Sequence, residues 1–238
     1  MNPTFSIGGE LEVRRLGFGA MRIVKDRAEG ARVVRRAVEL GVTLIDTADI
    51  YGAGVSEEVI ADALHPYPEN LVITTKGGLG HGLQERLRDA RPERLREACE
   101  ASLRRLKLER IDLYQLHRHD PEVPIEESVG ALEELRQEGK IRLIGLSNVS
   151  VGQLRQAQSV TRIVSVQNEY NRGLLTSEDV LAACEAEGIA FMPWSPLGEG
   201  LGEPASELRW LLDRSPVILP IPGTSSVEHL EANMQAVA

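Results

Sequence analysis

Eight short apolar runs alternate with amphipathic helical patterns along the chain, and this alternation predicts an α/β fold, a (β/α)8 TIM barrel. The runs are apolar almost throughout, as is typical of parallel strands covered on both faces. With 238 residues in all, each strand–helix unit would have about 30 residues, which suits a compact barrel. The expected strands are residues 16–21, 43–48, 71–76, 111–117, 141–147, 163–170, 189–195 and 217–222.

The helical patterns between these runs carry recognisable boundary signals. Residues 91–106 have a proline near their start and place four apolar side chains on one stripe of a helix. These side chains are Leu95, Cys99, Leu103 and Leu106. Three similar patterns stop at a glycine, as helices often do, and they cover residues 27–42, 124–140 and 176–189.

The segment before the first expected strand has a different pattern. In TFSIGGELEV, two short alternating runs flank Gly8 and Gly9, which is typical of a β-hairpin with a tight turn. We expect this N-terminal β-hairpin to close the bottom of the barrel. The sequence contains no linker or low-complexity stretch, so we expect a single barrel domain over residues 1–238.

Composition and charge exclude several classes of partner. Hydrophobic residues make up 42% of the chain and charged residues 26%, as in globular proteins in water, and no apolar run or signal-peptide pattern predicts a membrane. The net charge is −9 and the basic residues fall among glutamates on helix faces, so nucleic acid is not an expected partner. Cys99 and Cys184 lie on expected amphipathic helices, which predicts core thiols and a cytoplasmic protein.

Polar side chains occur where several expected strands end. Asp46 ends the second strand and Tyr51 follows it, Lys76 ends the third, and His117 ends the fourth. Because barrel active sites form at the carboxyl ends of the strands, we expect these four side chains to converge on one rim. Each has a purely structural alternative, such as a buried Asp–Lys pair or a core histidine, so the prediction depends on their convergence.

This combination of groups suits proton donation. A phenol is normally a poor acid at neutral pH, with a pKa of about 10. A nearby ammonium favours the tyrosinate and so makes the phenol a usable proton donor. The sequence therefore indicates a general acid at Tyr51, assisted by Lys76.

The chain resembles the aldo-keto reductases over nearly its whole length. The resemblance is carried by GFGAMR, LIDTADIYG, VITTKGG, RIDLYQLH, GKIRLIGLSN, VQNEYN, MPWSPLG and PIPGTSSVEHLEAN. It implies reduction of small aldehydes and ketones with a nicotinamide cofactor, NADP(H) by expectation and NAD(H) as an alternative. It also implies that Tyr51 protonates the carbonyl oxygen, that Asp46 fixes Lys76, and that His117 orients and polarises the carbonyl.

The resemblance further implies the contacts of the cofactor. Around the nicotinamide and its ribose it assigns Ala20, Met21, Asp46, Ser147, Asn148, Gln167 and the stacking ring of Trp194. Over the pyrophosphate it assigns Ser195, Pro196, Leu197 and Gly198. Near the adenosine phosphate and adenine it assigns Gly223, Thr224 and Ser225 at the start of the last helix, with His229 and Asn233.

The sequence departs from the family pattern in two respects. Many relatives carry lysine where Gly223 stands and arginine where His229 stands, and both cations would pair with the 2′-phosphate of NADPH. The loops after residues 23, 82 and 198 are short, although such loops build the substrate pocket. We therefore expect a pared-down or engineered member with an open site and broad specificity.

Four alternatives compete with this interpretation. KGGLGHG lacks the spacing of a doubly wound dinucleotide site, and no G-x-S-x-G elbow of a serine hydrolase occurs. His117 and His119 form an H-x-H pattern for a metal-dependent hydrolase, but two ligands are too few, and His65, His81 and His229 are not at strand ends. We expect no metal.

A weakly active barrel or a non-catalytic nicotinamide sensor would keep the same four residues. Nothing in the chain demands an interface, so we expect a monomer.

Overall fold

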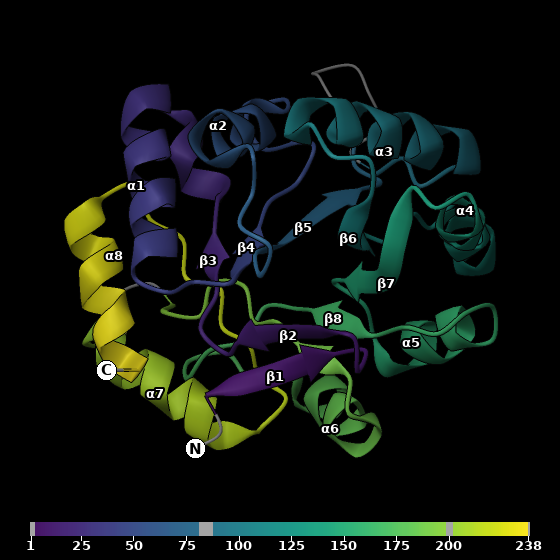
Figure 1. Cartoon of the computed structure of the whole chain (residues 1–238). Coiled ribbons are helices and arrows are strands. Elements are labelled where there is room, and N and C mark those ends of the chain that lie inside the picture. The colour runs from purple at the N-terminus through teal and green to yellow at the C-terminus, as the bar shows by residue number, and fades with distance from the viewer. Residues whose placement is uncertain (1–2, 81–87, 199–201, 238) are drawn as a thin grey trace.

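The computed structural model describes residues 3–80, 88–198 and 202–237, and its centre is a parallel sheet curled into a barrel (Figure 1). Each strand pairs in parallel with the next one along the chain, as a (β/α)8 fold requires. The seven strands are β3 (Phe18–Gly19), β4 (Leu44–Asp46), β5 (Val72–Gly77), β6 (Ile111–Leu116), β7 (Ile141–Ser147), β8 (Ser165–Gln167) and β9 (Ala190–Phe191). The predicted fold class is confirmed.

The eighth expected strand, residues 217–222, is an extended segment that closes the barrel without forming a regular ladder. On one side, the amide of Leu219 donates to the Phe191 carbonyl of β9 at 2.8 Å. On the other side, the carbonyls of Pro220 and Pro222 accept from residues 17 and 19 of the first strand at 3.0 and 3.1 Å. Because these two prolines have no N–H, they return no hydrogen bond to that strand, and half of the ladder is missing.

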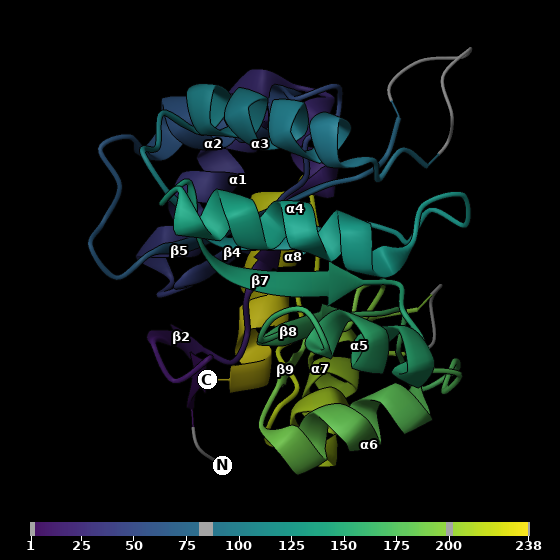
Figure 2. The same ribbon diagram turned by 90° about the vertical axis from the view of Figure 1, so that its right-hand side faces the viewer.

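The helices lie around the outside of the sheet and cover its outer face (Figures 1 and 2). The four helical patterns in the sequence are confirmed as α1 (Arg27–Glu39), α3 (Pro92–Leu106), α4 (Ile125–Gln137) and α6 (Glu178–Glu187). The remaining described helices are η1 (Met21–Val24), α2 (Val55–Leu64), α5 (Val151–Gln158), α7 (Pro204–Arg214), α8 (Val227–Met234) and η2 (Gln235–Val237). None of the described helices combines the length and the apolarity that crossing a bilayer requires.

Local side-chain chemistry sets where these helices begin. The Asp26 carboxylate accepts hydrogen bonds from two amides of the first turn of α1. Ser150 and Gln153 form a capping box at the start of α5. Because Ser150 caps α5, Ser147 and Asn148 at the end of β7 are available to line the barrel mouth.

The N-terminal hairpin closes the bottom of the barrel, as expected. Strands β1 (Thr4–Ile7) and β2 (Leu11–Arg14) pair antiparallel. The turn uses Gly8 and Gly9 at φ values of 61° and 73°, which favour glycine. Ile7, Leu11 and Val13 pack in one cluster with side chains of the lower barrel interior. Figure 2 shows the hairpin at the end of the barrel opposite the arrowhead of β7, so the other end is left for a site.

Both cysteines lie in the hydrophobic layer between sheet and helices, as predicted. Cys99 on α3 and Cys184 on α6 are buried and free. Burial raises the pKa of each thiol to about 12, which keeps it protonated and unreactive at neutral pH.

Candidate active site

Lys76 and Asp46 form a buried ion pair at the carboxyl ends of adjacent strands. Lys76 Nζ lies 2.7 Å from Asp46 Oδ2, and the exposed fractions of the two side chains are 0% and 3%. The ammonium also donates to the Thr47 carbonyl at 2.8 Å. A buried charge requires such partners, because its loss of hydration is otherwise uncompensated. Burial opposes the charged form, but Asp46 and Tyr51 raise the pKa of Lys76 overall, so it remains an ammonium.

The second oxygen of Asp46 is held by two glutamines from the barrel interior. Gln167 Nε2 donates to Asp46 Oδ1 at 2.8 Å, and Gln115 Nε2 lies 3.4 Å from the same atom. Gln115 also donates to Thr74 Oγ1 at 2.9 Å. Gln115 was not predicted, although a glutamine among the apolar residues near the end of β6 was the available signal. These contacts tie β4, β5, β6 and β8 together just below the rim.

Tyr51 is placed over this pair by the turn that follows β4. Its amide donates to the Ala48 carbonyl at 3.1 Å, and Gly52 follows at a φ of 61°. Tyr51 Oη lies 3.5 Å from Lys76 Nζ, which itself lies 5.1 Å from the centre of the phenol ring. Burial raises the pKa of Tyr51, and the Lys76 ammonium opposes that rise. The effect of Lys76 therefore has the expected direction, but burial outweighs it and the phenol stays protonated.

His117 completes the group directly after β6. Its backbone amide donates to the Gly77 carbonyl at 2.8 Å, and its ring meets Tyr51 edge to face at 6.0 Å between centroids. Burial, and then the charges of Lys76 and Arg118, hold the pKa of His117 well below its usual value. The imidazole is therefore neutral. Its Nδ1 is buried and has no hydrogen-bond partner among the described residues.

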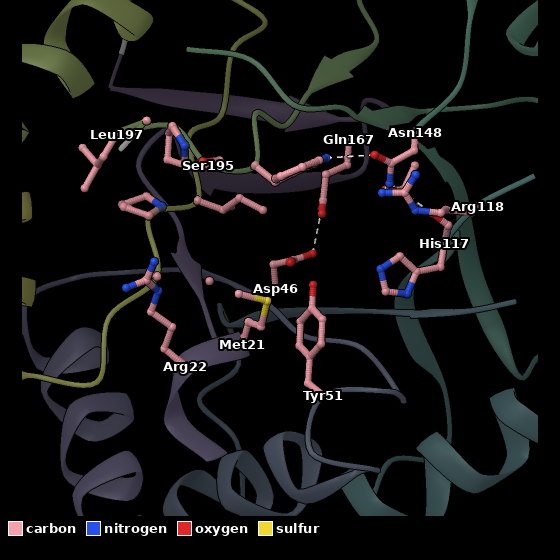
Figure 3. A pocket seen from close by; sticks show the side chains of 18 residues that line it. Met21, Arg22, Asp46, Tyr51, His117, Arg118, Asn148, Gln167, Ser195 and Leu197 are labelled. Carbon is pink, nitrogen blue, oxygen red and sulfur yellow. Dashed lines mark hydrogen bonds between the residues drawn. The ribbon is translucent and has the colours of Figure 1, made fainter. Parts of the chain in front are cut away.

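A cavity of about 340 Å³ opens above these residues (Figure 3). The structure brings most of the predicted residues together around it: Met21, Asp46, Tyr51, His117, Ser147, Asn148, Gln167, Trp194, Ser195, Pro196, Leu197, Gly198 and Gly223. Lys76 and Ala20 lie behind the wall. The Ala20 carbonyl accepts from Ser56 Oγ at 2.9 Å and its amide donates to the Asp46 carbonyl at 2.8 Å, so Ala20 supports the site from below.

The wall beyond His117 consists of hydrogen-bonding side chains and one indole ring. Trp194 Nε1 donates to Asn148 Oδ1 at 3.0 Å, and Asn148 Nδ2 donates to Ser147 Oγ at 2.8 Å and to the His117 carbonyl at 3.2 Å. Asn148 thus uses its amide within the protein. The Trp194 ring is fixed by its edge and lines the cavity, which suits a flat aromatic ligand.

The loop at residues 195–198 offers fewer backbone donors than the sequence suggested. Pro196 has no N–H, and the Gly198 amide already donates to the Ser195 carbonyl at 3.0 Å. Among the described contacts, the amides of Ser195 and Leu197 make no such internal hydrogen bond. These two donors are the ones that could reach an anion here.

The last helix begins later than expected. Ser226 caps α8, since its hydroxyl accepts from the His229 amide at 3.4 Å, so Gly223, Thr224 and Ser225 lie in the preceding turn. Thr224 Oγ1 accepts from the Ser226 amide at 3.1 Å. Of the five residues predicted for the adenosine end, only Gly223 lines the cavity; Thr224 and Asn233 are buried, and Ser225 and His229 are exposed.

The backbone segments that contain Gly19 and Gly223 pack closely against each other at this end of the cavity. A Cβ on Gly223 would lie 2.9 Å from the Gly19 carbonyl oxygen, and one on Gly19 would lie 2.7 Å from the Ile221 carbonyl oxygen. A side chain at either position would therefore push these two backbone segments apart. Together with the unpartnered His117 Nδ1 and the indole wall, this narrow floor fits a nicotinamide nucleotide laid along the cavity.

Two arginines of the cavity wall were not predicted. Arg22 and Arg118 both line the cavity, and Figure 3 shows them on opposite sides of Tyr51. Arg118 follows His117 directly, so its place beside a candidate catalytic residue was the available signal. Arg22 lies in η1, whose position over the cavity depends on tertiary packing and gave no signal.

The alternative metal site finds no support in the described part of the chain. Residues 3–80, 88–198 and 202–237 contain no group of three or more histidine, cysteine, aspartate or glutamate side chains able to hold an ion. His119 Nδ1 is buried without a partner, but no third ligand accompanies His117 and His119. His81 lies outside the described residues.

Known proteins resemble this chain over nearly all of its length. An uncharacterized oxidoreductase of Schizosaccharomyces pombe is 42% identical, with 96% of this chain and 83% of the relative covered. The pyridoxine 4-dehydrogenase of Escherichia coli is 39% identical, with 98% and 92% covered. These matches extend over 254 and 264 residues, more than the 238 of this chain, so the relatives have insertions within the matched region.

Solved structures and a family profile agree with these matches. The glycerol dehydrogenase of Gluconobacter oxydans superimposes with a TM-score of 0.93 at 28% identity, covering 100% of this chain and 91% of its own. An aldo-keto reductase of Klebsiella pneumoniae in complex with NADPH gives a TM-score of 0.86 at 29% identity, covering 99% and 89%. The profile of the aldo/keto reductase family matches residues 15–207. The chain belongs to the aldo/keto reductase family of oxidoreductases.

Proposed function

We propose that the protein reduces aldehydes and ketones to alcohols with NADP(H), using Tyr51 as the general acid. The observation that carries this proposal is the position of the Tyr51 hydroxyl. It faces the cavity 3.5 Å from Lys76 Nζ, and Asp46 holds the same ammonium at 2.7 Å. A protonated phenol backed by a fixed cation is suited to deliver a proton to an oxygen that gains negative charge.

In this proposal each residue of the site has a distinct task. The bound cofactor supplies the hydride that adds to the carbonyl carbon. Tyr51 gives its proton to the carbonyl oxygen, and the Lys76 ammonium stabilises the tyrosinate that remains. The neutral His117 donates its ring N–H to the same oxygen, which orients the substrate and polarises its carbonyl. Asp46 keeps Lys76 in place and charged.

The cavity wall supplies the proposed cofactor contacts. The nicotinamide would lie against Trp194, with its carboxamide near Ser147, Asn148 and Gln167, and its ribose beside Met21. The pyrophosphate would lie under residues 195–198, with Arg22 as a further cation. Gly223, Thr224, Ser225, His229 and Asn233 would surround the adenosine end. The indole wall, the two available amides and the narrow glycine floor support this direction.

NADPH is the proposed cofactor and NADH the alternative. Structures of aldo-keto reductases from Klebsiella pneumoniae contain NADP in one case and NADPH in another, which supports the phosphorylated form. Here His229 is exposed at the start of α8, where it would face a 2′-phosphate. A histidine binds phosphate less strongly than the arginine that many relatives carry at this position. The names of two relatives, pyridoxine 4-dehydrogenase and glycerol dehydrogenase, support interconversion of alcohols and carbonyls.

We also propose broad specificity and a cytoplasmic monomer. Relatives have insertions that this chain lacks, so fewer loop residues can restrict the substrate.

Both cysteines are buried and free, which is consistent with a reducing compartment. Sedimentation at several protein concentrations tests the monomer, and a partner copy found at all of them would contradict it.

A titration with each cofactor followed by a carbonyl panel tests the function. Tryptophan fluorescence should fall as NADPH binds, because Trp194 lines the cavity, and NADH should bind more weakly. Loss of NADPH absorbance with 4-nitrobenzaldehyde should then show turnover. Binding without turnover of any carbonyl would contradict the proposal and indicate a non-catalytic nicotinamide-binding barrel, and loss of turnover on chelation would indicate a metal.

A further inference from the structure

The geometry points to Arg118 as the residue that selects substrates with an anionic substituent, a carboxylate or a phosphate, away from the reacting carbonyl. This inference rests on the proposed function, because it concerns the substrate side of the same cavity. It names a class of substrate and a residue for recognising it, and it can be tested separately from the chemistry of Tyr51.

Arg118 lies at the nicotinamide end of the cavity, on the His117 side and away from the residues assigned to the pyrophosphate and the adenosine. In Figure 3 its side chain is on the His117 side of Tyr51 and next to Asn148, whereas Arg22 is on the other side of Tyr51, as are Ser195 and Leu197. The carbonyl oxygen of a substrate would lie between Tyr51 and His117. A substituent on that substrate can therefore reach Arg118 without displacing the cofactor.

The guanidinium of Arg118 is available for a ligand. It makes no hydrogen bond or ion pair with any described residue, while Arg105 and Arg172 are held by carboxylates at 2.6 and 3.0 Å. Arg118 is only half-buried, but its charge is felt at the site, since it contributes to the lowered pKa of His117. Arginine binds carboxylates and phosphates with two parallel hydrogen bonds, which gives selectivity as well as attraction.

The charge of the cavity favours an anion. Among the described residues that line it, Asp46 is the one carboxylate, and Lys76 already neutralises it at 2.7 Å. His117 is neutral. Arg22 is assigned to the pyrophosphate of the proposed cofactor, so Arg118 is the described lining cation that is left without a proposed partner, although the chain as a whole carries −9. An anionic substituent would supply that partner, and a neutral one would not.

A second cavity, of about 390 Å³, limits where the anion can lie. It shares Arg118, Asn148 and Trp194 with the first, and its far wall includes Glu169 and Asp179. These carboxylates disfavour an anion deep in the second cavity. The substituent is thus expected at the junction, where Arg118 stands and where a short anionic aldehyde would place it.

A matched pair of aldehydes tests this directly. The probes are 4-formylbenzoate and its neutral methyl ester, with 4-formylphenyl phosphate as the second anion. In R118Q, kcat/KM for 4-formylbenzoate should fall about 10- to 100-fold, mainly through KM, as expected for the loss of a charged hydrogen bond. The ester should change by less than about threefold, a difference too small for the loss of such a bond. R118K should recover part of the loss, and the anion with the larger fall identifies the preferred group.

Arg162 provides the control for net charge. It is exposed before β8 at the far end of the barrel and, like Arg118, makes no described ion pair, so R162Q removes the same charge without altering the site. An equal loss for anion and ester in R118Q, or the same anion-specific loss in R162Q, would overturn the inference.

A binding measurement separates this inference from the proposed function. Affinity for 4-(hydroxymethyl)benzoate, the alcohol product, can be measured by tryptophan fluorescence even in the absence of turnover, and R118Q should weaken it about 10- to 100-fold. If the ester is turned over normally and the anion is not preferred, only the role of Arg118 is refuted. If no carbonyl is turned over but the affinity depends on Arg118, only the proposed reaction is refuted.

Discussion

Lys76 Nζ and Tyr51 Oη lie 3.5 Å apart, with the ammonium buried and the hydroxyl facing the cavity. The two atoms are close enough for the ammonium to stabilise the tyrosinate as soon as it forms. They are too far apart for a strong hydrogen bond, so the phenol keeps its proton until a substrate accepts it. The strand ends fix the ammonium, and the turn after β4 fixes the hydroxyl.

Tyr51→Phe should abolish most of the reduction and leave cofactor binding nearly unchanged. The variant removes one oxygen from the cavity wall and no contact with the proposed cofactor. Loss of a positioned general acid lowers kcat by about 10²- to 10⁴-fold. Steady-state turnover and NADPH titration on the same protein measure the two effects.

Tyr67→Phe is the matched control for Tyr51→Phe. Tyr67 Oη donates to the Leu106 carbonyl at 2.6 Å, away from the cavity, so the same atom is deleted without touching the site. Turnover should remain near that of the wild type in this variant. Full activity in Tyr51→Phe would refute the assigned acid.

Asp46→Asn should destabilise the protein strongly as well as impair turnover. The substitution leaves the Lys76 ammonium buried without a counter-ion, and breaking such a pair costs about 3–5 kcal/mol. Adding Lys76→Met to it should recover part of the loss, because the unpaired charge is then removed as well. Urea unfolding of the wild type, of Asp46→Asn and of the double variant measures their free energies of unfolding.

An exposed ion pair gives the comparison for Asp46→Asn. Arg36 lies 2.8 Å from Glu231, and both side chains are well exposed. Glu231→Gln should therefore cost less than about 1 kcal/mol. Similar losses in Asp46→Asn and Glu231→Gln would mean that the buried pair contributes no more than a surface one.

The rate of reduction should be nearly independent of pH through the neutral range. The pKa of His117 is held well below 6.5 and the pKa of Tyr51 is raised above 10.0, so neither group changes protonation between these values. A fall is expected only on the alkaline side, where Tyr51 loses its proton. A pH profile of kcat with saturating cofactor checks this, and a step near pH 6.5 that is absent from His117→Gln would contradict a neutral imidazole.

The same histidine should make the protein less stable in mild acid. Its pKa is lower in the folded than in the unfolded chain, so the unfolded chain takes up a proton first as the pH falls. The stability that His117 contributes is therefore present above about pH 6.5 and is lost as the pH falls below it. His117→Gln should flatten this part of a stability–pH curve measured by urea unfolding.

Much of the barrel and its rim could be predicted because both depend on local sequence. Apolar runs that alternate with helical patterns predict the strands, and Asp46, Lys76 and His117 each stand at the end of one such run. The extended segment at residues 217–222 that closes the barrel was harder to predict. An apolar run does not reveal that Pro220 and Pro222 lack the N–H donors that would face the first strand. Arg22 gave no signal at all, because only the tertiary packing of η1 brings it over the cavity, and its own segment does not contain that information.

The last prediction concerns the hairpin that closes the barrel. Gly8→Ala should destabilise the protein by about 1–2 kcal/mol, because a left-handed φ disfavours alanine and little room is present. The φ is 61°, and a Cβ would lie 3.0 Å from Val164 Cγ1. Gly130→Ala should change the free energy of unfolding in the opposite direction, because Gly130 lies within α4 with nothing within 4 Å of its Cβ position.

Gly130→Ala should stabilise the protein by about 0.5–1 kcal/mol through the lower entropy of its unfolded chain. Urea unfolding of both variants measures the difference in sign. Equal effects would show that the turn is not held at the barrel bottom. Because the hairpin packs far from the rim, turnover per folded molecule should be the same in both variants, and a lower value in Gly8→Ala would mean that the hairpin also shapes the site.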